Sequence, residues 1–193
     1  NGSTASAKGI IGTLTANGFE WSETLGIQAT GFSSGFATTG VEKLYHGDNQ
    51  GYIYNHNTGN SFLTGGTALD IDAQYLTPHY DFGDVGTRKT LQYVKLSVTP
   101  EGEASPTLKI RYDYEDTTIP QPPEYILDNI PTPSLFGASV FAVAVFGAST
   151  DPMLRQAVQG SGNVCNLRIR SIDQKPPYAI NGLYINYVPS GRR

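Results

Sequence analysis

The sequence predicts an all-β fold, in which an antiparallel β-sandwich-like domain follows an N-terminal hairpin region similar to part of a propeller blade. Apolar and polar residues alternate with a period of two in several segments, and no apolar pattern of helical period extends beyond two turns. Glycine and proline number 22 and 12 among 193 residues. Many turns between short strands are therefore expected.

Four segments alternate most clearly, and each predicts a half-buried strand: 94–98, 108–114, 165–170 and 183–188. The connection 99–106, rich in Pro and Gly, predicts a hairpin between the first two. The turn-rich residues 173–177 predict a second hairpin between the last two. Residues 152–158 can accommodate one helical turn.

The chain is expected to divide into two parts. Residues 1–65 form a glycine-rich N-terminal β region with a hairpin at 44–54, and residues 66–193 form the antiparallel sandwich-like domain. Three prolines in 119–123 predict an extended arm, because proline cannot donate a ladder hydrogen bond. The first eight residues read as a polar linker, so we expect the chain to be a piece of a longer protein.

Composition argues against several functional classes. A net charge of −4 with only 16% charged residues disfavours a dedicated nucleic-acid binder, which needs a broad basic surface. The longest apolar run, 135–148, is shorter than the about 20 residues that span a bilayer, so no membrane anchor is expected. A single cysteine, Cys165, provides neither an internal disulfide nor a thiol-based zinc site.

The segment 140–146 is apolar on both faces of a predicted strand, although a short helix is the competing interpretation. A strand of this kind must be covered on both sides. Low charge and many aromatic residues also predict that neighbouring subunits cover part of the surface. We therefore expect a homo-oligomer, with a candidate subunit interface formed by Val140, Phe141, Val143, Val145, Phe146, Tyr52 and Tyr54.

No catalytic or metal-binding motif is convincing, so we expect no enzyme activity, cofactor or metal. His46, His56 and Asp48 lie on one hairpin and would form a metal site only if their side chains converged. Strand-end histidines are the ordinary explanation, as is an aromatic-packed loop position for His79. Cys165 is expected to be a buried, inert thiol. Three carboxylate pairs would serve glycoside hydrolysis or calcium binding only with a geometry that the sequence does not specify: Asp70/Asp72, Asp81/Asp84 and Asp113/Asp116.

Aromatic and basic residues leave one alternative open. Twelve tyrosines and Trp21 could stack on sugar rings, as in a carbohydrate-binding module, although tyrosine suits half-buried strands and subunit contacts equally well. The basic residues Arg168, Arg170, Arg192 and Arg193 could line a channel for DNA, but solubility of strand edges is the simpler explanation.

Several stretches resemble a known family. Residues 44–54 (LYHGDNQGYIY) and 57–62 (NTGNSF), then 75–84, 88–91 and the strand 111–114 (RYDY), are similar to segments of structural proteins of bacteriophage short tails. Residues 160–162 and 177–187 (PYAINGLYINY) fit the same pattern. The stretches cover about three-quarters of the chain, and none carries a diagnostic catalytic residue. The chain looks most like the C-terminal part of the nozzle (tubular tail) proteins of podovirus-type phages.

This resemblance implies a non-enzymatic virion tail component, assembled in the host cytoplasm. Nozzle subunits form a ring of six that extends the portal–adaptor channel and guides DNA during ejection. A hexameric ring, contacts with a portal adaptor or fibres, and transient, non-specific passage of DNA are therefore expected. Nozzle proteins are several times longer than this chain, which leaves copy number and ring position open. A carbohydrate-binding module, or another virion adaptor or decoration protein, remains the alternative function.

Overall fold

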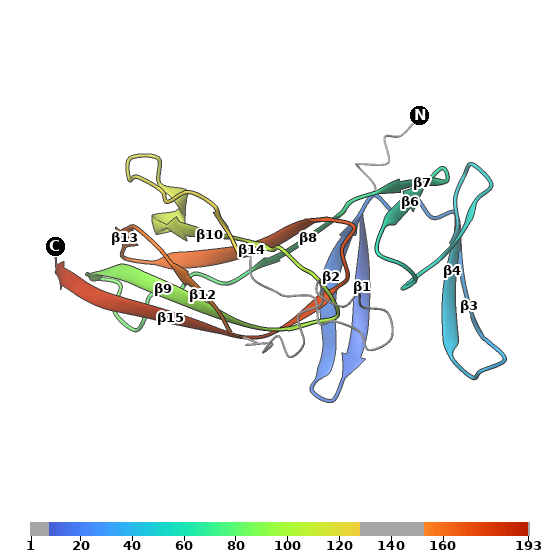
Figure 1. Ribbon diagram of the computed structural model, residues 1–193, viewed down its shortest axis with the longest axis horizontal. Coiled ribbons are helices and arrows are strands. Elements are labelled where there is room, and N and C mark those ends of the chain that lie inside the picture. The colour runs from blue at the N-terminus through green and yellow to red at the C-terminus, as the bar shows by residue number, and fades with distance from the viewer. Residues whose placement is uncertain (1–7, 128–152, 193) are drawn as a thin grey trace, which may run out of the picture. The chain divides into compact units, whose positions relative to one another are not determined.

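The computed structural model describes residues 8–127 and 153–192, whose regular secondary structure is β-strand apart from one short 3-10 helix, Asp113–Glu115 (Figure 1). The all-β, sandwich-like fold class is therefore confirmed. The chain divides into two compact units: unit 1 is Asn1–Gly59 with Leu63–Ala68, and unit 2 is Asn60–Phe62 with Leu69–Arg193. The boundary predicted between residues 65 and 66 falls within the stretch where the chain passes from one unit to the other.

Unit 1 contains small antiparallel sheets. β1 (Lys8–Thr15) and β2 (Gly18–Leu25) form a two-stranded hairpin, and Gly18 adopts a φ of +120° at its turn. β4 (Glu42–Gly47) pairs with β3 (Gly31–Phe36) on one side and β5 (Ile53–Asn55) on the other. β4 and β5 form the hairpin predicted at 44–54. A further hairpin, of β6 (Phe62–Thr64) and β7 (Thr67–Leu69), lies where the units meet along the chain.

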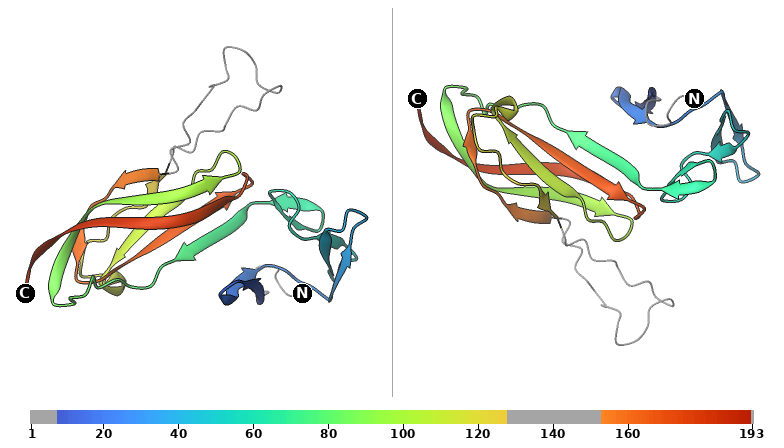
Figure 2. Two further views of the ribbon diagram at one scale, coloured as in Figure 1. Left: turned by 90° about the horizontal axis from the view of Figure 1, so that it is seen from below. Right: turned by 90° about the horizontal axis from the view of Figure 1, so that it is seen from above.

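Unit 2 is a sandwich of two antiparallel sheets, seen from two further directions in Figure 2. In the first, the β10 sheet, the strand order is β11 (Tyr125–Ile126), β10 (Thr107–Tyr112), β14 (Cys165–Asp173) and β8 (Ile71–Leu76). In the second, the β9 sheet, the long β15 (Tyr178–Arg192) pairs along one edge of β9 (Thr87–Pro100). The other edge of β9 pairs with β12 (Met153–Ala157) and β13 (Ser161–Gly162).

Both hairpins predicted for unit 2 are wrong. β9 pairs with β12, β13 and β15, whereas β10 pairs with β11 and β14, so residues 99–106 cross from one sheet to the other. Residues 173–177 likewise connect β14 to β15 across the sandwich. Strands in opposite sheets bury their apolar sides against each other, which a two-stranded hairpin does not achieve. The helical turn considered for 152–158 is the strand β12, because an edge of β9 pairs with it and sets Leu154 opposite Leu96.

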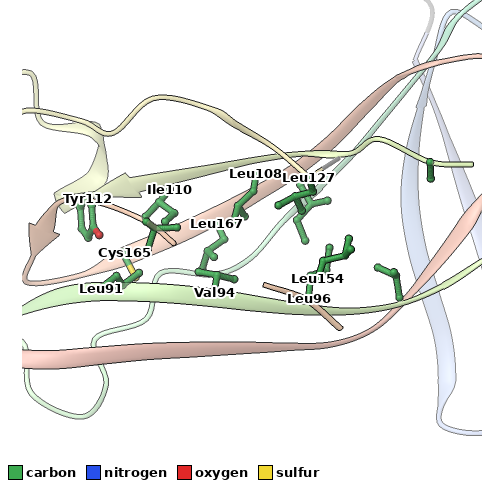
Figure 3. Close-up of a cluster of buried hydrophobic side chains, with 14 residues drawn as sticks. Leu91, Val94, Leu96, Leu108, Ile110, Tyr112, Leu127, Leu154, Cys165 and Leu167 are labelled. Atoms are coloured by element: carbon green, nitrogen blue, oxygen red, sulfur yellow. The ribbon is translucent and has the colours of Figure 1, made fainter. Parts of the chain in front are cut away.

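The core lies between the two sheets. Figure 3 shows Leu108, Ile110 and Leu167 pointing from the β10 sheet toward Val94 and Leu96 of the β9 sheet. Close packing of such side chains is the main source of stability in a domain of this kind. The other buried members of this cluster are Leu91, Val98, Ala104, Tyr112, Leu127, Leu154, Val158, Cys165 and Ile169.

A β-bulge at Gln92 changes which side chains of β9 face this core. β15 pairs Asn186 with Tyr93 but Tyr187 with Leu91, so Gln92 is the extra residue. Its carbonyl accepts a hydrogen bond from the Val158 N–H, at 3.1 Å. Inward positions therefore switch from odd numbers before the bulge to even numbers after it.

Candidate functional site

The candidate interface predicted from the sequence falls into two parts. Val140, Phe141, Val143, Val145 and Phe146 lie outside the residues that the structure describes. The remaining members, Tyr52 and Tyr54, belong to the β4–β5 hairpin. Tyr52 is 45% exposed, whereas the half-buried Tyr54 donates its hydroxyl to Asp48 Oδ2 at 3.1 Å and accepts the Gly65 N–H at 2.9 Å. Tyr54 thus belongs to the internal structure of unit 1, and Tyr52 stays available at its surface.

A larger apolar surface lies on one side of the β1–β2 hairpin. We call Ile10, Leu14, Phe19, Trp21 and Leu25 the hairpin face; the cross-strand register places them on one side, and each is 56–73% exposed. Phe19 and Trp21 stack with ring centroids 5.6 Å apart.

The Trp21 ring is fitted to a glycine on the facing strand. Trp21 lies opposite Gly12, and a Cβ added at Gly12 would come within 2.7 Å of the indole. A larger residue at Gly12 would force the indole away. The sequence does not mark this face by alternation, because the apolar Ile11 and the glycine at position 12 interrupt the pattern between Ile10 and Leu14.

A second apolar face belongs to the β3–β4–β5 sheet. Phe32, His46 and Tyr54 lie directly opposite one another on the three strands and so form one cross-strand row. The His46 and Tyr54 rings stack at 4.9 Å, and Phe32 lies 6.0 Å from His46. Phe32 and Phe36 share this side and are 65% and 78% exposed. We call Phe32, Phe36 and Leu44 the sheet face.

The two histidines considered for a metal site do meet. His46 Nδ1 lies 2.7 Å from His56 Nε2, so the N–H of one ring donates a hydrogen bond to the unprotonated nitrogen of the other. Burial and the facing His56 lower the pKa of His46, and Asp48 opposes this only in part. Asp48 itself accepts the N–H groups of Gln50 and Tyr52 at 2.8 and 2.9 Å.

These contacts show how the three residues considered as possible metal ligands are used. The Asp48 carboxylate closes the β4–β5 turn and accepts the Tyr54 hydroxyl, while the imidazoles bond to each other. Among residues 8–127 and 153–192, no group of three or more His, Cys, Asp or Glu is arranged to hold a metal ion.

The carboxylates of the three pairs considered for hydrolysis or calcium binding each have a structural partner. Asp72 forms a two-pronged contact with Arg170 at 2.7 and 2.8 Å, which lowers the pKa of Asp72. Asp70 accepts from Gln174. Asp81 and Asp84 accept turn amides, and Asp116 accepts both the N–H and the hydroxyl of Thr118.

Asp113 begins a strained turn. It and the next two residues, Tyr114 and Glu115, have φ values of +48°, +60° and +61°, which is costly for residues with a side chain. The Asp113 carboxylate holds the turn in place by accepting the N–H groups of Asn163 and Val164.

The remaining candidates are also structural. Cys165 is 1% exposed, and burial raises its pKa to about 12, which keeps the thiol protonated. The His79 ring packs on Tyr114, with ring centroids 4.3 Å apart. Arg168 pairs with Glu124, and Arg170 with Asp72, so neither presents an unneutralised charge to a channel. The side chains of Arg192 and Arg193 lie outside the described residues.

Comparison with known proteins adds no family to this geometry: no protein-family model and no curated protein matches the chain. In the part of the chain that the structure describes, no helix has the length and apolar character needed to cross a bilayer. The most prominent candidate sites are therefore two apolar faces of unit 1, the hairpin face and the sheet face. Such faces bind other apolar surfaces rather than small polar substrates.

Proposed function

We propose that this chain is a non-enzymatic structural subunit that associates with copies of itself. The observation that carries the proposal is the pair of apolar faces on unit 1, in which Ile10, Leu14, Trp21, Phe32 and Phe36 are each more than 60% exposed. A two-stranded hairpin is marginally stable in water on its own, so the hairpin face gains most from being covered. A neighbouring subunit supplies that cover.

The size of the faces favours several contacts per subunit. Fully burying a large apolar side chain contributes roughly 1.5–3 kcal/mol. Because each of the five residues of the hairpin face is 56–73% exposed, covering them contributes at most about 10 kcal/mol. Association costs on the order of 4–15 kcal/mol, because the subunits lose translational and rotational freedom and interface side chains become ordered. Burial of one face alone therefore only offsets this cost. Two different faces allow head-to-tail contacts that close into a ring.

The ring that we propose is part of a phage tail, of the nozzle type, located in the virion and assembled in the host cytoplasm. This step rests on the resemblance to short-tail proteins of residues 44–54, 57–62, 75–84, 88–91, 111–114, 160–162 and 177–187. A net charge of −4 suits a wall that lets DNA pass, since a basic wall would hold the phosphates. We propose six copies, with a portal adaptor or fibres as neighbours.

The single tryptophan provides the test of self-association, because Trp21 lies on the hairpin face. Light scattering and Trp21 emission should be recorded over the same concentration series. We expect the mass to rise to a multiple of 20.8 kDa while the emission shifts to shorter wavelength. A constant monomeric mass with solvent-exposed emission throughout contradicts the proposal.

The location in the tail needs a separate experiment. Antibodies against the chain, applied to purified virions, should label the tail below the portal. Label on the head surface would indicate a decoration protein, and label on fibres an attachment protein. Absence from purified virions contradicts any virion role, whatever the mass of the assembly.

A carbohydrate-binding module is the second candidate, and the exposed ring of Trp21 favours it. At 67% exposure the indole offers apolar area to a sugar ring. Titration with neutral oligosaccharides should quench or shift Trp21 emission if this function is correct. Emission that stays unchanged at millimolar sugar removes this candidate.

A further inference from the structure

The outward side of the β9 sheet carries a row of basic and aromatic side chains. Arg155 on β12 lies opposite Lys95 on β9, and Tyr184 on β15 lies opposite Lys95 on the other side. The row spans two strand spacings, about 10 Å. Arg155 is exposed, and Tyr184 is 57% exposed. We call these three residues and Tyr93 the basic row.

The two cations of the basic row are crowded together. Arg155 and Lys95 occupy directly opposite positions, where like charges repel. Both also lie over the Tyr93 ring, with Arg155 Cζ 4.4 Å and Lys95 Nζ 5.7 Å from its centroid. The ring's electron-rich face offsets part of the repulsion. An anion bound between the two cations would remove the rest.

No described carboxylate neutralises these cations. The three cross-strand sets at and beside the row are Met153–Ser97–Gly182, Arg155–Lys95–Tyr184 and Ala157–Tyr93–Asn186, and none contains Asp or Glu. On the β10 sheet, by contrast, Arg111, Arg168 and Arg170 each have a carboxylate within 3.2 Å. The basic row is therefore a local positive site on a chain of net charge −4.

We propose that the basic row binds an acidic oligosaccharide. The guanidinium of Arg155 and the ammonium of Lys95 hold a carboxylate or sulfate group, which the planar Arg fork contacts with two parallel hydrogen bonds. Tyr184 provides an exposed ring, with a hydroxyl, on which the adjoining sugar packs. The Tyr93 ring already has the two cations over it, so Tyr184 is the platform.

Charge spacing favours a glycan over nucleic acid. Duplex DNA carries one charge per about 1.7 Å of axis, and a protein binds it by neutralising many phosphates. The two cations of the basic row would neutralise few phosphates. The net negative charge of the chain would also repel a polyanion as densely charged as DNA. An acidic glycan with one charge every one or two sugars matches a site with one cation pair and one neighbouring ring.

The test is a titration of the full chain with an oligogalacturonate hexamer, followed by calorimetry or by NMR of the tyrosine side chains. Maltohexaose serves as the neutral probe and a dT oligomer as the nucleic-acid probe. We expect the acidic hexamer to bind, the neutral hexamer to bind at least about tenfold more weakly, and the affinity to fall with added salt.

Single substitutions distinguish binding at the basic row from non-specific electrostatic attraction of the acidic hexamer to the protein. Lys95→Gln and Arg155→Gln should each weaken binding about tenfold, and Tyr184→Ala should weaken it while Tyr184→Phe retains it. Lys109→Gln, on the outward side of the β10 sheet, is the matched control and should leave the affinity unchanged. Tighter binding of dT than of the hexamer, an equal loss in Lys109→Gln, or no binding at millimolar hexamer would overturn the proposal. These outcomes do not depend on whether the chain self-associates.

Discussion

Replacing Gly162 with alanine tests the packing of the sandwich at the end of β13. A Cβ at this position would lie 2.8 Å from Tyr112 Cδ1, 2.9 Å from Tyr112 Cβ and 3.0 Å from Asp113 Oδ2. Carbon atoms in ordinary contact are about 3.5–4.0 Å apart, so the overlaps are about half an ångström or more. Tyr112 is 0% exposed and has no solvent-filled space to move into.

The expected cost follows from these contacts. Overfilling a well-packed core typically costs about 1–3 kcal/mol, and alanine recovers about 0.4–1 kcal/mol by restricting the unfolded chain. We expect Gly162→Ala to lower the free energy of unfolding of unit 2 by about 1–2 kcal/mol.

The matched control lies in β15 of the same unit. An alanine Cβ at Gly182 would meet Tyr184 Cε2 at an ordinary 3.6 Å, so Gly182→Ala should be neutral or slightly stabilising. Urea unfolding followed by circular dichroism measures both variants. Equal stability of Gly162→Ala and Gly182→Ala would show that the Tyr112 ring does not close over β13.

Three further predictions concern buried groups. Leu167→Ala should destabilise unit 2 by about 3–5 kcal/mol in urea unfolding, because Leu167 is 0% exposed. Ile172→Ala is the control on the same strand; Ile172 is 51% exposed, so this change should cost under about 1 kcal/mol. Equal losses would contradict the placement of Leu167 in the core. The lowered pKa of His46 means that the unfolded state binds the proton more tightly, so stability of unit 1 should be complete above about pH 6.5 and fall as the pH drops toward the lowered value. In the His46→Phe variant, the urea midpoint of unit 1, followed by Trp21 emission, should fall less steeply as the pH drops. An unchanged pH dependence would show that His46 does not cause the decline. Native Cys165, with its pKa raised to about 12 by burial, should react with a disulfide reagent at pH 8 at least about a thousandfold more slowly than in urea; similar rates would show an accessible thiol.

Alternation located the main strands of unit 2 but not their partners. The segments 94–98 and 165–170 alternate and lie within β9 and β14. The segment 108–114 also alternates, but β10 ends at Tyr112, and residues 113 and 114 belong to the strained turn that follows it. Alternation identifies which side of a strand is buried, and it carries no information on which sheet the strand joins. The loops 99–106 and 173–177 contain turn residues that suit a crossing of the sandwich as well as a hairpin.

Two features of unit 2 could not be predicted from the alternation of apolar and polar residues. The bulge at Gln92 changes the inward positions of β9, and the residue that bonds to it, Val158, lies far along the chain. The basic row depends equally on register, since Arg155, Lys95 and Tyr184 are separated by many residues and become neighbours only through β12 and β15. Contacts between the His46 and His56 rings were foreseeable, because β4 and β5 form a short hairpin.

The central claim is that copies of this chain cover the apolar faces of unit 1, and sedimentation equilibrium of the native chain beside Trp21→Ser and Phe32→Ser variants tests it most directly. We expect an assembly of several copies for the native chain and a lower mass for each variant, with the fold of unit 2 intact by circular dichroism. A native chain that sediments at 20.8 kDa at every concentration, or variants that assemble as the native chain does, would contradict it.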